Sequence, residues 1–341
     1  MYASVHGGGL AARVPYDADR PKYPPTPVHR HRRIDWARYR RFLRHRWRPL
    51  FLLVRQLVRT VPPPYDVRPP GTPGRPPTDP RDVVRFLLLR ALEGWSYDET
   101  HATLAACSDF RRLLGFHRLP AAPTVAALAS RVPSTYLEQL ITELVRHGAR
   151  TPLQLAGDAS GLSTRRFERW TAARTHSGHR HAFVKLHALV TTQAQFPFFC
   201  AAQVTDAYTN DVTELPRLLQ QLPTDLPLGN VVLDKGYIGR RNAQAIADRG
   251  GRPVIALRKN IPLHTTPDSA PAWKAMVVDQ FHHRREFRCR YRRRAVIEGV
   301  FGAFKERFGS TVRSRRADTR RVEILCRVVV WNALAVTYHR G

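Results

Sequence analysis

The chain has 341 residues, enough for two domains of which at least one has a sizeable hydrophobic core. It contains 56 Lys and Arg residues against 27 Asp and Glu residues, a formal net charge of +29, and 43% of its residues are hydrophobic. This balance excludes a disordered basic tail and indicates a folded protein with a strongly basic surface. Nucleic acid is the expected partner of such a surface, and a membrane surface is the alternative.

The cysteine and apolar patterns point to a reduced, cytoplasmic setting. The four cysteines are scattered and form no C-x-x-C pair, which argues against a cysteine zinc ribbon and a disulfide framework. No run approaches the ~18 apolar residues of a membrane span, and the first residues lack the apolar core of a signal peptide. We therefore expect a soluble, intracellular protein with no membrane partner.

The first 80 residues form three segments of different composition. Residues 1 to 33 are rich in Gly, Pro, His and Arg and predict a flexible basic arm. Residues 34 to 61 alternate aromatic and aliphatic side chains with Arg, as in a basic amphipathic helix interrupted at Pro49. This helix either packs on the neighbouring domain or contacts DNA or a membrane surface. Residues 62 to 80 are proline-rich and predict an extended linker.

Residues 81 to 150 predict a small helical domain. Asp79 or Asp82 begins its first helix, Ser96 caps the second, and Ser134 begins the last, which ends near Gly148. Short helices joined by tight turns with basic residues between them are compatible with helix-turn-helix DNA binding. Many small helical domains share this pattern, and it does not identify a recognition helix.

Residues 151 to 341 predict an α/β domain. Five strand-like runs occur in the order LQLAGDASGLS, AFVKLHALVTT, FFCAAQVTDAY, NVVLDKGY and RPVIALR. The second and third runs are close enough to form a hairpin. Helical patterns occupy residues 210 to 222 and 240 to 249, residues 259 to 290 are irregular and basic, and residues 317 to 338 form a final apolar helix. The expected fold is a mixed sheet flanked by helices.

Two aspartates stand in or just after strand-like runs. Asp158 follows an apolar run and precedes small residues, and Asp234 follows Val231 to Leu233 and precedes Lys235. Acids at strand ends commonly converge at one edge of a sheet. Taken singly, each aspartate is also typical of a turn at the end of a strand.

A third carboxylate belongs to a predicted helix. There Tyr291, Arg294, Glu298 and Lys305 fall within ~60° of one another, beside an apolar stripe. The alternative is an ordinary surface helix with solvated charges. Three converging carboxylates repel one another, and two magnesium ions are the natural compensation for hard oxygen ligands. Two such ions can support phosphodiester cleavage and transfer.

Other polar residues compete with this assignment. Asp206 also ends a strand-like run and is the leading substitute for one of the three acids, whereas Asn210 or Asp211 fits a helix cap. A group of histidines has Arg180 and Lys185 interleaved but no Cys partner, which favours phosphate contact over zinc. These histidines are His176, His179, His181 and His187.

Asp158, Asp234 within LDKGY, and the Y-(2)-R-(3)-E-(6)-K spacing that begins at Tyr291 resemble the DDE transposases of bacterial and archaeal insertion sequences. The resemblance covers about residues 150 to 338, and residues 65 to 130 are similar to the helical amino-terminal domain of the same transposases. It implies a ribonuclease-H-like catalytic fold, two Mg²⁺ ions for which Mn²⁺ substitutes, and a nucleoid-associated protein in the cytoplasm. It also implies a homodimer or higher oligomer on double-stranded DNA, acting on element ends and target.

The resemblance assigns roles by position. Asp158, Asp234 and Glu298 correspond to the catalytic metal ligands. The residues expected to hold the DNA backbone near the scissile phosphate are Tyr291, Arg294 and Lys305. We further expect Lys235 to contact DNA, and Lys185 and His187 either to support the ligands or to contact DNA.

The predicted function is therefore a transposase. It binds the terminal inverted repeats of its element, cleaves the ends by two-metal hydrolysis and joins the 3′-hydroxyl ends to target DNA. The alternatives are a transposase-derived nuclease that cuts without joining and a non-catalytic DNA-binding regulator. The 63 residues from 235 to 297 are too few for the large β-rich insertion of some relatives, which favours direct water attack over a DNA hairpin.

Overall fold

The computed structural model describes residues 36–69, 73–74, 76–164, 183–258 and 271–340. The described residues belong to one compact unit that begins at Trp36. The predicted basic arm, residues 1 to 33, lies outside the described residues, as do His176, His179 and His181.

Two helices replace the single interrupted helix predicted for residues 34 to 61. They are α1 (Trp36–His45) and α2 (Trp47–Thr60). The predicted interruption at Pro49 is wrong, because the break falls at Arg46 and Pro49 lies in the first turn of α2. Proline is tolerated there since the first N–H groups of a helix have no intrahelical partner. Helix α2 buries an apolar face, whereas α1 buries no residue completely.

The remaining amino-terminal helices begin where the sequence predicts. They are α3 (Pro80–Glu93), α4 (Tyr97–Ala106), α5 (Ser108–Leu114), α6 (Ala122–Leu128), the short turn η1 (Ala129–Arg131) and α7 (Ser134–Gly148). The Asp79 carboxylate accepts from the Arg81 N–H to cap α3, and Ser96 and Glu99 form a reciprocal capping box on α4. The described residues of the predicted linker form no helix or strand before Pro80.

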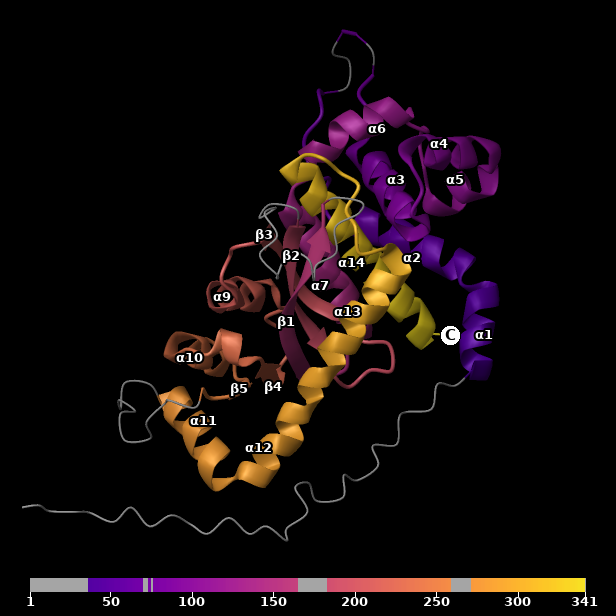
Figure 1. The fold of residues 1–341 in the computed structure, drawn as a ribbon. Coiled ribbons are helices and arrows are strands. Elements are labelled where there is room, and N and C mark those ends of the chain that lie inside the picture. The colour runs from indigo at the N-terminus through magenta and orange to yellow at the C-terminus, as the bar shows by residue number, and fades with distance from the viewer. Residues whose placement is uncertain (1–35, 70–72, 75, 165–182, 259–270, 341) are drawn as a thin grey trace, which may run out of the picture. The chain divides into compact units, whose positions relative to one another are not determined.

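The five predicted strands form one mixed sheet in the order β3-β2-β1-β4-β5. Their bounds are β1 (Leu153–Ser163), β2 (Phe183–Thr191), β3 (Phe199–Asp206), β4 (Leu228–Leu233) and β5 (Arg252–Ile255). Strands β1, β2 and β3 are antiparallel, with β2 and β3 joined as the predicted hairpin, whereas β4 and β5 run parallel to β1. This mixed sheet with its flanking helices is the expected α/β, ribonuclease-H-like fold (Figure 1).

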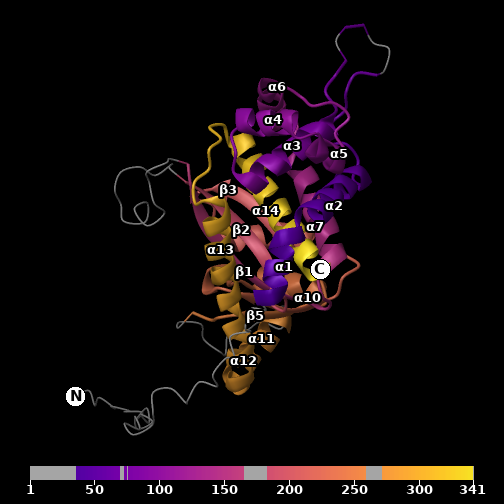
Figure 2. The same ribbon diagram turned by 90° about the vertical axis from the view of Figure 1, so that its right-hand side faces the viewer.

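Helices cover the sheet and extend beyond it. They are α9 (Asp211–Gln221), η2 (Lys235–Tyr237), α10 (Arg240–Asp248), α11 (Pro271–His282), α12 (Arg284–Tyr291), η4 (Arg292–Arg294), α13 (Ala295–Phe308) and α14 (Ala317–Arg340). The prediction that residues 259 to 290 are irregular is wrong from Pro271 onward. Trp273, Met276 and Val277 are buried on α11 with helical spacing, which the surrounding cations obscured in the sequence. Figures 1 and 2 show α12 and α13 as a nearly continuous rod along one side of the sheet.

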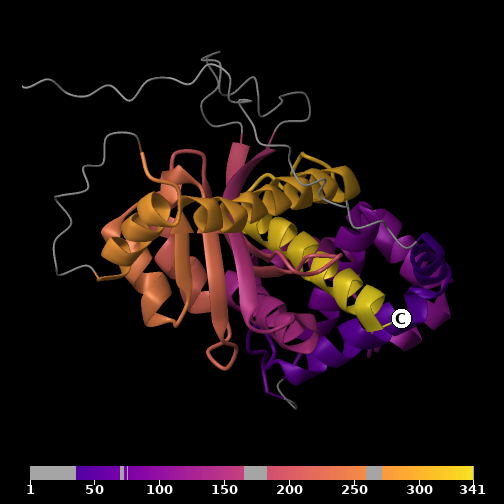
Figure 3. The same cartoon turned by 90° about the horizontal axis from the view of Figure 1, so that it is seen from below.

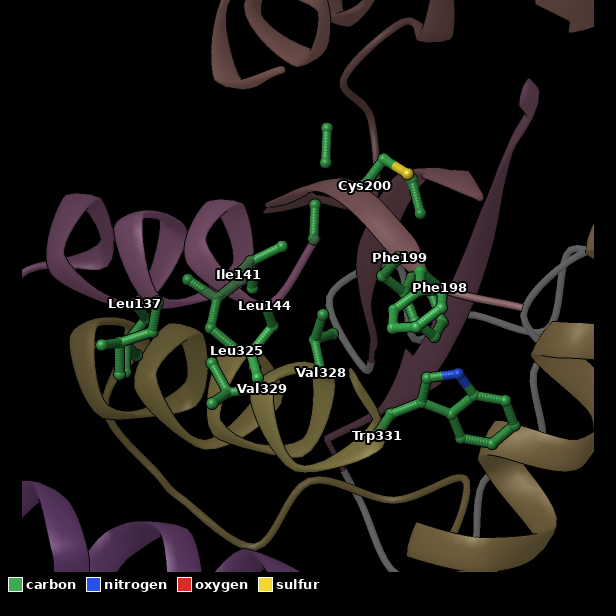
Figure 4. Close-up of a cluster of buried hydrophobic side chains, with 14 of the residues drawn as sticks. Leu137, Ile141, Leu144, Phe198, Phe199, Cys200, Leu325, Val328, Val329 and Trp331 are labelled. Atoms are coloured by element: carbon green, nitrogen blue, oxygen red, sulfur yellow. The ribbon is translucent and has the colours of Figure 1, made fainter. Parts of the chain in front are cut away.

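Helix α14 forms the centre of the core. It packs against α7, β3, α3 and α2, and Figure 3 shows it running toward the amino-terminal helices. Side chains of α7, β3 and α14 meet in one apolar cluster (Figure 4). Trp331 donates from Nε1 to the Pro197 carbonyl, and the Asn332 amide bonds both backbone groups of Phe199, so α14 is also fixed by buried hydrogen bonds.

Helix α14 is apolar enough to resemble a membrane-spanning helix. Among the described residues it is the helix long and apolar enough to cross a membrane by length and composition, but 94% of its apolar window is buried inside the fold. A core helix has this character. The same helix packs on elements from both sides of the predicted domain boundary near residue 150, so the packing shows no gap there.

Candidate active site

Asp158 and Asp234 lie on neighbouring parallel strands. The register pairs Gly157 of β1 with Leu233 of β4, so the aspartate that follows each of them reaches the same level of the sheet. Neighbouring strands are ~4.8 Å apart, which brings the two carboxylates side by side. The charge of Asp234 is one of the causes that raise the pKa of Asp158, consistent with this proximity.

Gly157 leaves space for two leucine side chains that pack over β1. A Cβ atom on Gly157 would lie 2.3 Å from Cδ2 of Leu233 and 2.8 Å from Cδ2 of Leu189. Both neighbours are completely buried, so neither has free space to move into. A larger residue here would therefore disturb the packing directly before the two aspartates.

We expect Gly157→Ala to destabilise the protein by about 1–3 kcal/mol, because the added methyl overpacks the sheet. The rate of DNA cleavage should also fall, and by more than the loss of folded protein explains, because the added methyl displaces the backbone next to Asp158. Thermal unfolding and cleavage rates measure the two effects. Gly299→Ala is the control, because a Cβ there meets nothing within 4 Å. A Gly157→Ala protein with wild-type stability would contradict the expected clash.

Arg294 joins the first and third acids. Its Nη1 lies 3.3 Å from Oδ2 of Asp158, and its Nη2 donates to Oε1 of Glu298. Asp158 and Glu298 are thus one guanidinium apart, although 139 residues separate them in the sequence. The structure therefore brings together all three acids that the sequence singled out.

The prediction that the signature residues lie on one regular helix is wrong, because they belong to three consecutive helical elements. Tyr291 ends α12, Arg294 ends the 3₁₀ turn η4, and Glu298 and Lys305 lie on α13. Tyr291 stacks on Phe287 with ring centroids 5.9 Å apart. The turn shifts the helical phase at Arg294, whose side chain reaches Asp158, without breaking the rod that α12 and α13 form.

Burial and neighbouring charges oppose ionisation of Asp158. Desolvation is the largest cause of its raised pKa, and the carboxylates of Asp234 and Asp211 raise it further. The backbone N–H of Ala159 and the cation of Arg294 act in the opposite direction. A carboxylate cluster of this kind is stabilised by added positive charge, and hard oxygen ligands suit divalent ions such as Mg²⁺.

Asp211 is a further acid near the site. The prediction that Asn210 or Asp211 caps α9 is confirmed for Asn210, whose side chain accepts from the Val212 N–H. Asp211 instead accepts from Nζ of Lys185, at 3.2 Å, and its Oδ2 lies 3.7 Å from the position of a Cβ on Gly236. Nothing in the local sequence distinguishes Asp211 from a cap, because its place depends on the path of β2, β3 and α9.

Two predicted contacts on β2 lie inside the fold. Lys185 donates to the Thr209 carbonyl as well as to Asp211, and His187 is completely buried. His187 contacts Thr205 through Nε2, at 2.9 Å, while its Nδ1 lies 3.5 Å from Asp211. The arrangement fits the expectation that these residues support the acids and leaves His187 no surface for DNA.

We expect His187 to make the protein less stable in mild acid. Burial, with a contribution from Lys185, lowers the pKa of His187 to about 4 despite the opposing charge of Asp211. The unfolded chain therefore binds a proton between pH 6.5 and about 4 that the folded protein excludes. Stability is complete above pH 6.5 and falls as the pH drops through this window, by at most about 3 kcal/mol.

Thermal unfolding of His187→Gln at pH 7.5 and pH 5 tests this expectation. The variant should lose less stability between the two pH values than the wild type does. His147→Gln, at an exposed position on α7, should behave as the wild type. An identical pH response in wild type and His187→Gln would remove His187 as the cause.

The expected DNA-contacting cations flank the acids. Lys235 follows Asp234 directly and is exposed, while Lys305 lies two turns after Glu298 on α13 and is half-buried. Desolvation lowers the pKa of Lys305. Buried Tyr237, at the end of η2, has a hydroxyl group without a hydrogen-bond partner among the described residues, and no sequence pattern predicts this.

Other acid groups have structural explanations. Oδ1 of Asp206 accepts from the N–H groups of Tyr208 and Thr209, which makes it a turn former. Among the described residues, one His/Asp/Glu trio has its ligand atoms within 4.8 Å of one another, namely Asp79, Asp82 and His117. Asp79 caps α3 and bonds His117, and Asp82 is buried against Arg85 at 2.6 Å. In the predicted catalytic trio, a guanidinium occupies the space between two of the acids.

Comparison with known proteins agrees with this geometry. The family model described as "Transposase DDE domain" matches residues 150–333. The chain belongs to the DDE transposase family. It is also similar to a candidate transposase for insertion sequence element IS402 from Burkholderia cepacia, with 32% identity over 193 residues that cover 51% of this chain and 87% of that protein. No solved structure matches.

Membership fixes the coarse function of this DDE transposase. The matched region contains the complete sheet, all three acids and most of α14. Enzymes of the family cleave nucleic acid with divalent metal ions, and DNA is their partner. The resemblance seen in the sequence is thereby confirmed at the level of the family.

Proposed function

We propose that this transposase cleaves the DNA at the ends of its insertion sequence and joins the freed 3′-hydroxyl groups to target DNA. The observation that supports the proposal most directly is the bridge from Arg294 to Asp158 and Glu298, beside Asp234 on the neighbouring strand. Asp158 belongs to β1, Asp234 follows β4 and Glu298 belongs to α13, and the proximity of these three segments supports the proposal.

Asp158, Asp234 and Glu298 would hold two Mg²⁺ ions, for which Mn²⁺ is a substitute. Their carboxylate oxygens are the ligands that Mg²⁺ prefers, and burial, with smaller contributions from Asp234 and Asp211, raises the pKa of Asp158, so that a bound cation would stabilise its ionised form. When bound, such ions activate a water or a 3′-hydroxyl group as nucleophile and stabilise the leaving oxygen. Neutral or basic side chains in place of the three acids would not bind these ions.

The remaining roles belong to side chains around the acids. Arg294 holds Asp158 and Glu298 at a fixed spacing. Lys235 and Lys305 place positive charge beside the trio, where it would bind the phosphates on either side of the cleavage site, with Tyr291 alongside. Lys185 and His187 position Asp211 from within the sheet.

The state in which the protein acts also belongs to this proposal. Excision of an element requires both of its ends, so we expect a homodimer or higher oligomer on double-stranded DNA. The net charge of +29 favours a nucleoid-associated protein in the cytoplasm. The helical region, residues 81 to 150, is the proposed reader of the terminal repeats. The described residues between Asp234 and Glu298 are mainly helical, with β5 as the one strand among them, which supports direct water attack over a hairpin route.

The test uses the full chain, the DNA that flanks its reading frame, a supercoiled target and Mg²⁺. We expect nicks at the element ends followed by joined products, and neither product in EDTA. Nicks without joining would indicate a nuclease, and binding without either product would indicate a regulator. Both outcomes would overturn the proposal.

A further inference from the structure

A cavity of about 900 Å³ lies between the end of α3, the end of β1 and the connection from α13 to α14. Ligand-binding cavities are commonly of this size. Its charged and aromatic lining comprises Arg90, Arg313, Arg315, Arg327, Trp95 and Phe308. None of the three catalytic acids lines it, so it is separate from the site described above.

Arg90 is the unusual member of this lining. Its side chain is only 9% exposed, and it makes no hydrogen bond to any described residue. Its guanidinium lies over the ring of Tyr97, 4.4 Å from the centroid. A buried guanidinium with unused donors is costly to a fold, because the donors have lost water without gaining partners. Such a group indicates a ligand that supplies the missing acceptors.

The neighbouring arginines differ from Arg90 because their donors are used. Arg327 donates to Glu323 and to two backbone carbonyls, and Arg313 donates to the Gly94 carbonyl. Glu323 is the one acid among the described lining residues. It accepts from Arg327 and from groups of the α13–α14 connection, and the charge of Arg90 also lowers its pKa, but one carboxylate leaves the four arginines of the lining with a net positive charge.

The distance from this cavity to the acids suits one strand of DNA. Six residues of β1 separate Asp158 from Thr164 at the cavity, which is ~20 Å, and ten residues of α13 separate Glu298 from Phe308, which is ~15 Å. Successive phosphates of one strand advance by ~3.4 Å along the axis of double-stranded DNA. A strand whose scissile phosphate lies at the acids could therefore reach the cavity about four to six nucleotides away.

We propose that this cavity binds a single nucleotide of a DNA strand, with its phosphate on Arg90 and Arg315 and its base against Trp95 and Phe308. Guanidinium groups pair with phosphate through parallel hydrogen bonds, and aromatic side chains stack on bases of any sequence. The position of the nucleotide, four to six from the cleavage site, rests on the proposed function. The capture of a phosphate by Arg90 does not.

The experiment measures binding of a labelled 30-nucleotide single strand to the full chain in EDTA, where cleavage does not occur. Arg90→Gln should weaken binding about tenfold and lower the slope of log affinity against log salt by about one. Trp95→Ala should also weaken binding. Arg217→Gln, which removes an exposed cation of α9, should change affinity by less than about twofold.

Thermal unfolding separates this role from a structural one. Because Arg90 makes no hydrogen bond within the described fold, Arg90→Gln should lose little more than the contact with the Tyr97 ring and unfold within about 4 °C of the wild type. If Arg90→Gln fails to fold, the exposed Arg315→Gln variant takes its place and should also weaken binding more than Arg217→Gln does. Equal effects of the cavity and control variants overturn the proposal.

A second arm distinguishes a strand from a free nucleotide. Thymidine 5′-monophosphate should compete with the labelled strand only weakly, because one nucleotide lacks the flanking contacts. If binding of the monophosphate depends on Arg90 while Arg90→Gln binds the strand as tightly as the wild type does, the proposal that a strand occupies the cavity is overturned. If the wild type cleaves DNA but strand binding does not depend on Arg90, this inference is overturned and the proposed function is unaffected.

Discussion

Glu298→Gln is expected to reduce DNA cleavage by about a hundredfold to a thousandfold while leaving DNA binding intact. The change preserves the shape of the side chain but removes the charge that completes the acidic trio, and losing one preorganised electrostatic contact costs up to this much in comparable sites. Glu298 is 57% exposed and its pairing with Arg294 is a surface interaction, so the fold should not suffer. Single-turnover cleavage and a binding assay in EDTA measure the two properties.

Glu306→Gln provides the matched control for this experiment. Glu306 lies on the same helix as Glu298, is also exposed, and is not part of the trio. The control should cleave at the wild-type rate. Cleavage retained by Glu298→Gln at more than about a tenth of the wild-type rate would remove Glu298 from the mechanism.

Arg327→Met is expected to destabilise the fold by about 3–5 kcal/mol, because it leaves the buried Glu323 carboxylate without its charged partner. The Arg327 side chain is 7% exposed and Glu323 4%, and their closest atoms are 2.6 Å apart. Arg327 also donates to the carbonyls of Gly309 and Thr311, so it holds the α13–α14 connection against α14. The unfolding temperature should fall by roughly 6 °C or more.

The control and the pH response make this prediction specific. Arg316→Met removes a 74% exposed partner of Asp318 and should change stability by less than about 0.5 kcal/mol. The double variant Glu323→Gln with Arg327→Met should recover part of the loss, because no buried charge remains. Burial favours a high pKa for Glu323, but Arg327 and several hydrogen bonds outweigh it and lower the pKa. The wild type therefore loses this stability only as the pH falls through that lowered pKa.

Much of the site could be predicted because its acids have strong local context. Asp234 lies directly after an apolar strand, Asp158 lies within one among small residues, and Glu298 keeps a fixed spacing from Arg294 on an amphipathic segment. The short link between the second and third strand-like runs likewise predicts the hairpin of β2 and β3. These signals are sufficient to predict that three carboxylates far apart in the sequence form one site.

The parts that could not be predicted depend on contacts between distant segments. Asp211 looks like a helix cap, and only the folded path places it near Asp158. Arg90 looks like any arginine of an amphipathic helix, and its unused donors follow from how α3 meets α14. The 3₁₀ turn at Arg294 also escapes helical periodicity, because a turn of three residues shifts the phase without an obvious break in composition.

The burial of α14 has a consequence for biosynthesis. Strand β3 and helices α2, α3 and α7 all rest on a segment that begins at residue 317. A nascent chain that lacks this segment exposes apolar surface on each of them, and such surfaces promote aggregation. We therefore expect ribosome-bound intermediates to remain open to chaperones until α14 emerges, after which the helical layers and the sheet close in one late, cooperative event.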